Sequence, residues 1–174
     1  LRYERCFYFV SVFMGSVHSV EDIVITGEPR SGKTFFLLNN AEADSWFVDV
    51  NSFSEQLLYD SILLYKPNSI FVDDVDIDPA IIELLVNIRK LIGGKFRIVC
   101  TTLKDDISIS RLETANFNPS WINLDRLDQD IILEILLNQL NERNLQRNFY
   151  IENLIIQQSL GLPGLTQMLC EASV

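Results

Sequence analysis

Cysteine is scarce in this sequence, and the few thiols form no recognisable site. The chain has 3 cysteines in 174 residues, and Cys6, Cys100 and Cys170 lack the close spacing of metal ligands. An odd number also leaves one thiol outside any disulfide pairing. We therefore expect reduced, partly buried cysteines in a cytoplasmic protein.

Positive charge is scarce as well. Lysine and arginine number 14 against 24 aspartates and glutamates, which gives a net charge of −10. Proteins that hold DNA or RNA by charge usually present a basic patch. No cluster of lysines and arginines stands out here, so the composition argues against a free-standing electrostatic grip on nucleic acid.

The sequence also lacks long apolar runs, internal repeats and low-complexity tracts. The apolar run Cys6–Met14 follows two arginines, as in a signal peptide, but it is too short to cross a bilayer. We favour packing of this run against the rest of the protein over secretion, and we expect no membrane association. With 48% hydrophobic and 22% charged residues, the chain is typical of one globular domain with at most a small appendage.

The most specific signal is one short stretch, residues 27–34, of the form G-x-x-x-x-G-K-T. The run Asp22–Thr26 before it suits a buried strand, and Phe35–Leu38 after it can open a helix. In the order strand, loop, helix, the glycines let successive backbone N–H groups face phosphate oxygens. The sequence thus predicts a nucleotide site made by Gly27, Glu28, Pro29, Arg30, Ser31, Gly32, Lys33 and Thr34.

The last two residues of this phosphate loop have distinct expected roles. Lys33 would bind the β- and γ-phosphates, and Thr34 would offer its hydroxyl to Mg²⁺. The expected ligands are ADP or ATP with Mg²⁺. The preference between the two nucleotides stays open.

A second candidate site follows the apolar run Ile70–Val72, which ends in Asp73 and Asp74. The carboxyl ends of strands in an open α/β sheet are where ligands collect. We expect Asp73 to face Mg²⁺, directly or through a water, and Asp74 to polarise the attacking water. Many phosphate-loop ATPases carry glutamate at this second step, and aspartate is one methylene shorter. We therefore expect weak or absent hydrolysis by the chain itself.

Strand and helix patterns alternate over the first part of the chain. The alternation predicts an α/β fold whose parallel five-stranded sheet carries helices on both faces. A capping-box pattern at Ser52–Glu55 marks one helix start, and Asp78-Pro79 marks another. From Leu127 onward only helical patterns follow. We place the boundary between a nucleotide-binding core, 1–125, and a small helical piece, 126–174. Strands are predicted at residues 22–26, 45–50, 69–74, 96–102 and 121–124.

In this order of features the chain resembles the AAA+ ATPases, a branch of the P-loop NTPases with a small C-terminal helical lid. Within them it is most similar to the DnaA-related group, and especially to the short regulatory relatives of the replication initiator. The stretches that carry the resemblance are Ser69–Asp76, Phe96–Thr102, Ile109–Leu112, Ile122–Asp128 and Asn141–Leu145.

The resemblance implies two further catalytic roles beside Asp74. Thr101 or Thr102 would be sensor 1, the polar residue that hydrogen-bonds the γ-phosphate or the attacking water. Arg111 would be an arginine finger, acting in trans on nucleotide held by a neighbouring protomer or by DnaA itself. Without the resemblance, Arg111 is equally well interpreted as a surface salt-bridge residue after a short helix.

The sequence departs from the group's pattern in two places. A sensor 2 arginine is expected near Gly161–Leu165, and none is there, which weakens the case for intrinsic hydrolysis. The chain also has no room after Val174 for a helix-turn-helix domain, so no direct, sequence-specific DNA binding is expected. The clamp-binding peptide that the resemblance implies would lie before Leu1.

These observations favour an adenine-nucleotide-binding regulator of DNA replication initiation. By resemblance it would contact the sliding clamp and stimulate ATP hydrolysis by a DnaA-like initiator. The alternative is a self-hydrolysing AAA+ ATPase, such as a helicase loader. A small-molecule kinase is a third candidate, but the C-terminal helices show no arginine-rich lid. A homo-oligomer stays open, and the adenine pocket is expected to use residues from Tyr8–Val20 and from the lid.

Overall fold

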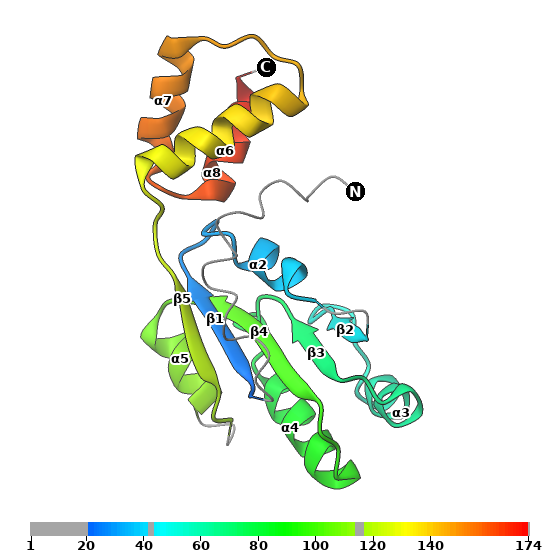
Figure 1. Cartoon of the computed structure of the whole chain (residues 1–174). Helices are drawn as coiled ribbons and strands as arrows, with labels where there is room; N and C mark the ends of the chain where they lie inside the picture. Colours follow the sequence, from blue (N-terminus) through cyan, green and yellow to red (C-terminus); the bar gives the residue numbers. More distant parts are fainter. Residues whose placement is uncertain (1–20, 42–43, 114–116, 174) are drawn as a thin grey trace. The chain divides into compact units, whose positions relative to one another are not determined.

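The computed structural model describes residues 21–41, 44–113 and 117–173. Two predictions fall outside these residues: the packing of Cys6–Met14 and the contribution of Tyr8–Val20 to an adenine pocket. The described chain alternates strands and helices and then continues in helices alone (Figure 1). In order, the elements are β1 (Ile23–Gly27), α2 (Lys33–Asn39), β2 (Ser45–Val48), α3 (Glu55–Tyr65), β3 (Ser69–Val72), α4 (Ala80–Ile92), β4 (Arg97–Leu103), α5 (Asp106–Glu113), β5 (Ser120–Leu124), α6 (Gln129–Glu142), α7 (Phe149–Ser159) and α8 (Pro163–Ala172).

The five strands form one sheet in the order β2-β3-β4-β1-β5. The pairs β1–β4, β3–β4 and β2–β3 are parallel, as crossover connections through helices require. The predicted α/β fold with a parallel five-stranded sheet is therefore confirmed. This order places β1, which precedes the phosphate loop, and β4, which contains Thr101 and Thr102, side by side near the middle of the sheet.

Helices cover both faces of the sheet. Val24 and Ile98 belong to one hydrophobic cluster with Ile82 and Leu85 of α4. Because side chains alternate along a strand, Phe71 points to the opposite face from its neighbours, and it too is fully buried. Central strands buried on both faces explain why β1, β3 and β4 appear in the sequence as nearly unbroken apolar runs.

The end of α4 agrees with the sequence, whereas the starts of α4 and α3 differ from it. α4 begins at Ala80 with Pro79 as its N-cap, one residue later than Asp78-Pro79 predicts, and the Ala80 N–H donates to the Asp78 carboxylate over 3.2 Å. Gly93 ends α4 with a φ of 60°. The capping box at Ser52 is wrong, because α3 begins at Glu55 with Ser54 as its N-cap. The Ser52 hydroxyl instead donates to Asp49 over 2.8 Å, since a nearby carboxylate competes successfully for it.

The described residues divide into two compact units. One comprises the sheet and its helices, residues 21–27 and 33–123. The other, which we call the helical unit, comprises residues 124–173 together with Glu28–Gly32 of the phosphate loop. The division into a 1–125 core and a 126–174 lid stays a prediction. What the structure adds is that part of the phosphate loop contacts the C-terminal helices.

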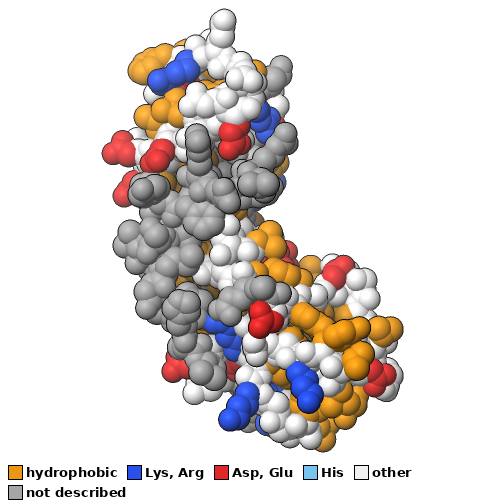
Figure 2. All heavy atoms as spheres, turned by 45° about the vertical axis from the view of Figure 1, so that its right-hand side comes forward, with side chains coloured by type: hydrophobic (Ala, Val, Ile, Leu, Met, Phe, Trp, Pro, Cys, Tyr) orange, Lys and Arg blue, Asp and Glu red, His pale blue; other side chains and the backbone are white. Residues whose placement is uncertain are grey.

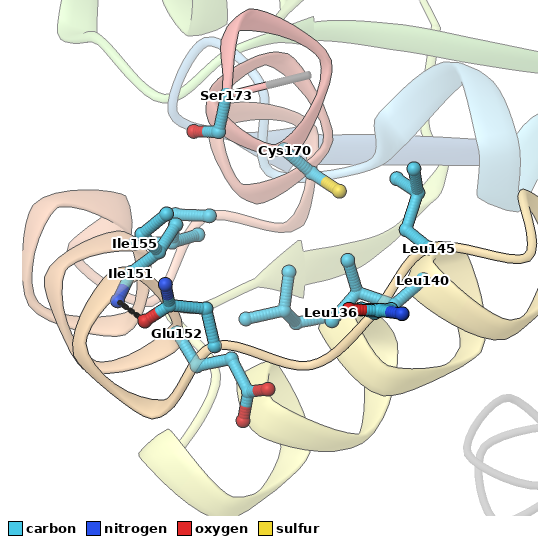
Figure 3. Close-up of a pocket in the computed structure, with 10 residues that line it drawn as sticks. Leu136, Leu140, Leu145, Ile151, Glu152, Ile155, Cys170 and Ser173 are labelled. Atoms are coloured by element: carbon cyan, nitrogen blue, oxygen red, sulfur yellow. Dashed lines mark hydrogen bonds between the residues drawn. The ribbon is translucent and has the colours of Figure 1, made fainter.

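The helical unit has its own small core. Leu136 and Leu140 of α6 pack with Ile155 of α7 and Cys170 of α8. A hollow of about 240 Å³ lies among these helices (Figure 3). Its polar groups are already engaged, because Asn148 caps α7 and Glu152 pairs with Arg147. The hollow is therefore not the candidate site.

The expectations on thiols and on membranes can be compared with the described residues. Both cysteines in the described ranges, Cys100 and Cys170, are free and buried. No helix in those ranges has both the length and the hydropathy of a membrane span.

Apolar side chains gather on the surface around α3 (Figure 2), where Leu57, Leu64 and Tyr65 are exposed. Exposed apolar patches are typical of protein contact surfaces.

Candidate functional site

The phosphate loop connects β1 directly to α2, as the motif requires. Arg30 and Gly32 both have left-handed backbone, with φ of 68° and 95°. The Ser31 N–H donates to the Glu28 carbonyl over 3.1 Å, which closes a turn inside the loop. Left-handed residues between a strand and a helix are typical of backbone concavities that bind anions.

Lys33 begins α2 and lies almost wholly buried, with 6% of its surface exposed. Its amine donates to the carbonyl oxygen of Gly27 over 3.2 Å. Burying a lysine amine is costly unless polar groups compensate it. The fold thus holds a cation at the start of the phosphate loop, where a phosphate would be its natural partner.

Three predicted residues meet at Asp73. The Thr34 hydroxyl donates to Asp73 Oδ2 over 2.6 Å, and the Thr101 hydroxyl donates to Asp73 Oδ1. The Asp74 N–H in turn donates to the Thr101 hydroxyl over 2.8 Å. The structure thereby joins α2, the end of β3 and the end of β4 around one carboxylate.

The donors at this junction suit Mg²⁺. A carboxylate and a hydroxyl are hard oxygen ligands, and Mg²⁺ takes few protein oxygens beside water and phosphate. No group of three or more His, Cys, Asp or Glu side chains that could hold a metal occurs in the part of the chain that the structure describes. A magnesium ion at Thr34 and Asp73 would take its other ligands from nucleotide and water.

Asp74 lies next to this junction in an unusual conformation. Its φ is 51°, in the left-handed region that aspartate tolerates better than most residues. Burial raises the pKa of Asp74, the charges of Asp73 and Asp76 raise it further, and Lys33 lowers it. A raised pKa favours a general base over a permanently charged group, but the side chain keeps the short reach of aspartate.

The raised pKa of Asp74 predicts a pH-dependent gain in stability for Asp74→Asn. The folded state binds the proton more tightly than the unfolded state, so the free energy of unfolding falls as the pH rises from the ordinary value of 3.8 through the raised one. The asparagine variant has no carboxyl group to ionise at this position, so its free energy of unfolding does not fall in this way. We expect it to exceed the wild type in stability at neutral pH, with a smaller difference in acid, as measured by urea unfolding.

Asp105→Asn is the matched control for this prediction. Hydrogen bonds, first of all from the Ser108 N–H, lower the pKa of Asp105. A lowered pKa contributes stability at neutral pH that is lost in acid, so this variant should be less stable than the wild type at neutral pH. If Asp74→Asn gains the same free energy of unfolding at all pH values, the charge of Asp74 does not cause the gain, and the cause is the backbone conformation alone.

The structure separates the two threonines that the sequence left as alternatives. The Thr101 hydroxyl is engaged with Asp73 and with the Asp74 N–H. The Thr102 hydroxyl is buried without a hydrogen-bond partner among the described residues, and so is that of Ser31. Buried hydroxyls are normally paired, so these two are the groups for which a ligand or water would supply the missing partner.

Polar groups that the sequence analysis missed lie at the same ends of the strands. Thr26, in register with Thr102, donates through its hydroxyl to Asn123 of β5 over 3.3 Å. Asp76 accepts from the Leu103 N–H over 3.2 Å. The only sequence signal for these residues is their place at or just after the end of an apolar strand.

Arg111 lies on α5, a helix that contributes none of the site residues described so far. It occupies the last turn of α5 and is exposed. Exposure on a helix end suits a guanidinium that acts on another molecule, and it equally suits a surface ion pair.

The first turn of α8 contacts the phosphate loop without an arginine. The Gly164 N–H donates to the Arg30 carbonyl over 3.0 Å, and a Cβ at Gly164 would come within 3.1 Å of that oxygen. The arginine of the helical unit that does reach the loop is Arg126, which forms two hydrogen bonds with Glu28. Sequence reasoning missed this pair, because nothing local connects residues 98 positions apart.

Comparison with known proteins identifies the fold. No family model and no curated protein sequence matches this chain. Among solved structures, RuvB of Thermotoga maritima, the Holliday junction branch migration motor, matches 87% of this chain and 53% of its own length, with a TM-score of 0.65 and 14% identity. The replication initiator DnaA bound to AMPPCP and single-stranded DNA matches 98% of this chain and 61% of its own, with a TM-score of 0.60 and 15% identity.

This chain has the AAA+ ATPase fold. The AAA domain of FIGL-1 in complex with ADP agrees, with a TM-score of 0.61 and 17% identity over 93% of this chain and 63% of that one. At such identities the likeness shows the fold alone. The chain spans 53% to 63% of the length of these three AAA+ structures. The predicted resemblance is thus confirmed for the AAA+ fold, and it includes a DnaA structure.

Proposed function

We propose that this chain is a regulator of DNA replication initiation of the Hda kind. It binds ADP or ATP with Mg²⁺ and stimulates ATP hydrolysis by a DnaA-like initiator. The observation that carries nucleotide binding is the junction at Asp73, where the Thr34 hydroxyl meets the carboxylate over 2.6 Å directly after a buried Lys33. The likeness to a DnaA structure over 98% of the chain supports the initiator as partner.

Each part of the site has a role in this proposal. Backbone N–H groups of the phosphate loop and the Lys33 amine bind the phosphates. Thr34 and Asp73 hold Mg²⁺, which neutralises phosphate charge when bound. Thr101 orients Asp73. Thr102 is the better candidate for sensor 1, because its buried hydroxyl is unpaired among the described residues whereas that of Thr101 is engaged.

Two features favour ATP hydrolysis at the partner's nucleotide site over hydrolysis at the site of this chain. Asp74 is shorter than glutamate and lies in left-handed backbone, and the turn Gly161–Leu165 contacts the loop without a cation. An exposed arginine that is supplied to another molecule's ATP neutralises transition-state charge there. We assign this role to Arg111. Contact with the sliding clamp is carried over from the resemblance, and the apolar surface around α3 supports a protein partner.

The alternative is a self-hydrolysing AAA+ ATPase or helicase-loader-type protein. Asp74 favours this alternative, because burial raises its pKa beside the Asp73 junction and a general base needs such a shift. In that case Arg111 would act on the nucleotide of another copy of this chain. Hydrolysis would then rise with protein concentration and with added DNA.

Titration calorimetry with MgADP and with MgATP tests the proposal. We expect binding of both, tighter for ADP, and turnover by the chain alone slower than about one per second. Addition of the chain to an ATP-bound DnaA-like initiator should then accelerate ATP hydrolysis there. Tighter binding of ATP with heat from turnover would favour the alternative. Binding of neither nucleotide would overturn both functions.

A further inference from the structure

The phosphate loop carries an acidic residue, Glu28, that pairs with an arginine near the start of the C-terminal helices. Arg126, between β5 and α6, donates from Nε to Glu28 Oε1 over 3.0 Å and from Nη2 to Oε2 over 2.9 Å. Two parallel bonds between guanidinium and carboxylate fix the orientation of both groups. Both side chains are about half exposed, at 53% and 45%, so solvent and salt reach the pair.

Backbone contacts hold Arg126 in place for this pair. The Leu127 N–H donates to the Gly161 carbonyl over 2.8 Å. Gly161 has a φ of 78°, and a Cβ there would come within 2.6 Å of the Leu127 carbonyl oxygen. Because Gly164 in the same turn bonds to Arg30 of the loop, one turn fixes both the residue after Arg126 and the loop that carries Glu28.

Glu28 creates an electrostatic problem for a phosphate site. It is the second residue of the loop, in a chain with a net charge of −10, and a nucleotide adds several negative charges beside it. Like charges within a Debye length repel, and the repulsion grows with the number of phosphates. A paired carboxylate presents far less field to the ligand than an unpaired one.

We propose that Arg126 is a positioning residue that neutralises and orients Glu28, so that the phosphate loop accepts a nucleoside di- or triphosphate. The inference rests on the proposed nucleotide binding. It assigns to Arg126 an action through Glu28 and no direct contact with phosphate. The cost of losing Arg126 should therefore vanish when the negative charge of Glu28 is removed as well.

The test measures MgADP and MgATP affinity by calorimetry in Arg126→Ala, Glu28→Gln and the double variant. We expect Arg126→Ala to bind about threefold to tenfold more weakly, with the larger loss for ATP and a smaller one at high salt. Glu28→Gln sets the reference for the double variant, because it removes the charge of Glu28 while Arg126 is kept. The double variant should bind within about twofold of Glu28→Gln.

Arg143→Ala is the matched control, because Arg143 pairs with Glu171 near the other end of α8 at 36% and 47% exposure. It should bind nucleotide as the wild type does. Wild-type affinity in Arg126→Ala would overturn the inference while leaving the proposed function intact. A double variant as weak as Arg126→Ala would also overturn it, since Arg126 would then act on the nucleotide itself or on folding. A wild-type chain that binds neither nucleotide would overturn the proposed function first, and this inference with it.

Discussion

Replacing Lys33 by alanine is expected to weaken binding of MgADP and MgATP by about 100-fold. Lys33 is 6% exposed, and its amine donates to the Gly27 carbonyl at the start of the phosphate loop. A charge-assisted hydrogen bond from a buried amine to phosphate is among the strongest polar contacts a protein makes, because little water competes for it. Titration calorimetry of the purified variant measures the loss.

Lys95→Ala is the control for this experiment. Lys95 is exposed and precedes β4, at the opposite end of that strand from Thr101. It should bind both nucleotides as the wild type does. Circular dichroism of Lys33→Ala should match that of the wild type, which checks that the variant is folded. Unchanged nucleotide affinity in Lys33→Ala would show that the loop does not bind phosphate through this residue.

Replacing Arg111 by alanine is expected to reduce the stimulated ATP hydrolysis of a DnaA-like initiator by about 1,000-fold. An arginine finger acts only in the transition state, where it neutralises charge that the nucleotide's own site leaves exposed. Its place in the exposed last turn of α5 permits such an action. The measurement is the single-turnover rate of hydrolysis in ATP-loaded initiator, with the variant or the wild-type chain added.

Two variants sharpen the Arg111 experiment. Arg111→Lys should lose most of the stimulation too, because an ammonium lacks the planar fork of guanidinium. Arg143→Ala removes another partly exposed arginine and should retain full stimulation. Full stimulation by Arg111→Ala would exclude the trans-arginine mechanism. The self-hydrolysing alternative would instead be supported if the wild-type chain alone hydrolyses ATP at a rate that rises with its concentration and Arg111→Ala abolishes this activity.

The three central strands were predictable because they are buried on both sides. When helices cover both faces of a sheet, its central strands are mostly apolar, so β1, β3 and β4 stand out as nearly unbroken runs. Their ends deviate from prediction by one or two residues. For example, the third strand ends at Val72 and not at Asp74, because the acids leave the ladder to form the junction with Thr34 and Thr101.

Local polar patterns were less reliable than apolar ones. The sequence around Ser52 has the form of a capping box, yet Asp49 takes the Ser52 hydroxyl and α3 starts later. Short polar side chains can choose among several nearby partners of similar strength. The same limit left Thr101 and Thr102 as alternatives, since adjacent strand residues point to opposite faces and only the position of β3 decides which one meets Asp73.

The sequence by itself determined the phosphate loop, the apolar strand before the two aspartates and the change to helices near Asp125. Each of these is a property of a short continuous segment, so composition and spacing suffice to find it. Only the tertiary structure decided which threonine is engaged, and that Arg126 pairs with Glu28 across 98 positions. Such contacts depend on which distant segments the fold brings together. The residues involved lie in or next to loops, and loops have no hydrophobic periodicity from which their position could be predicted.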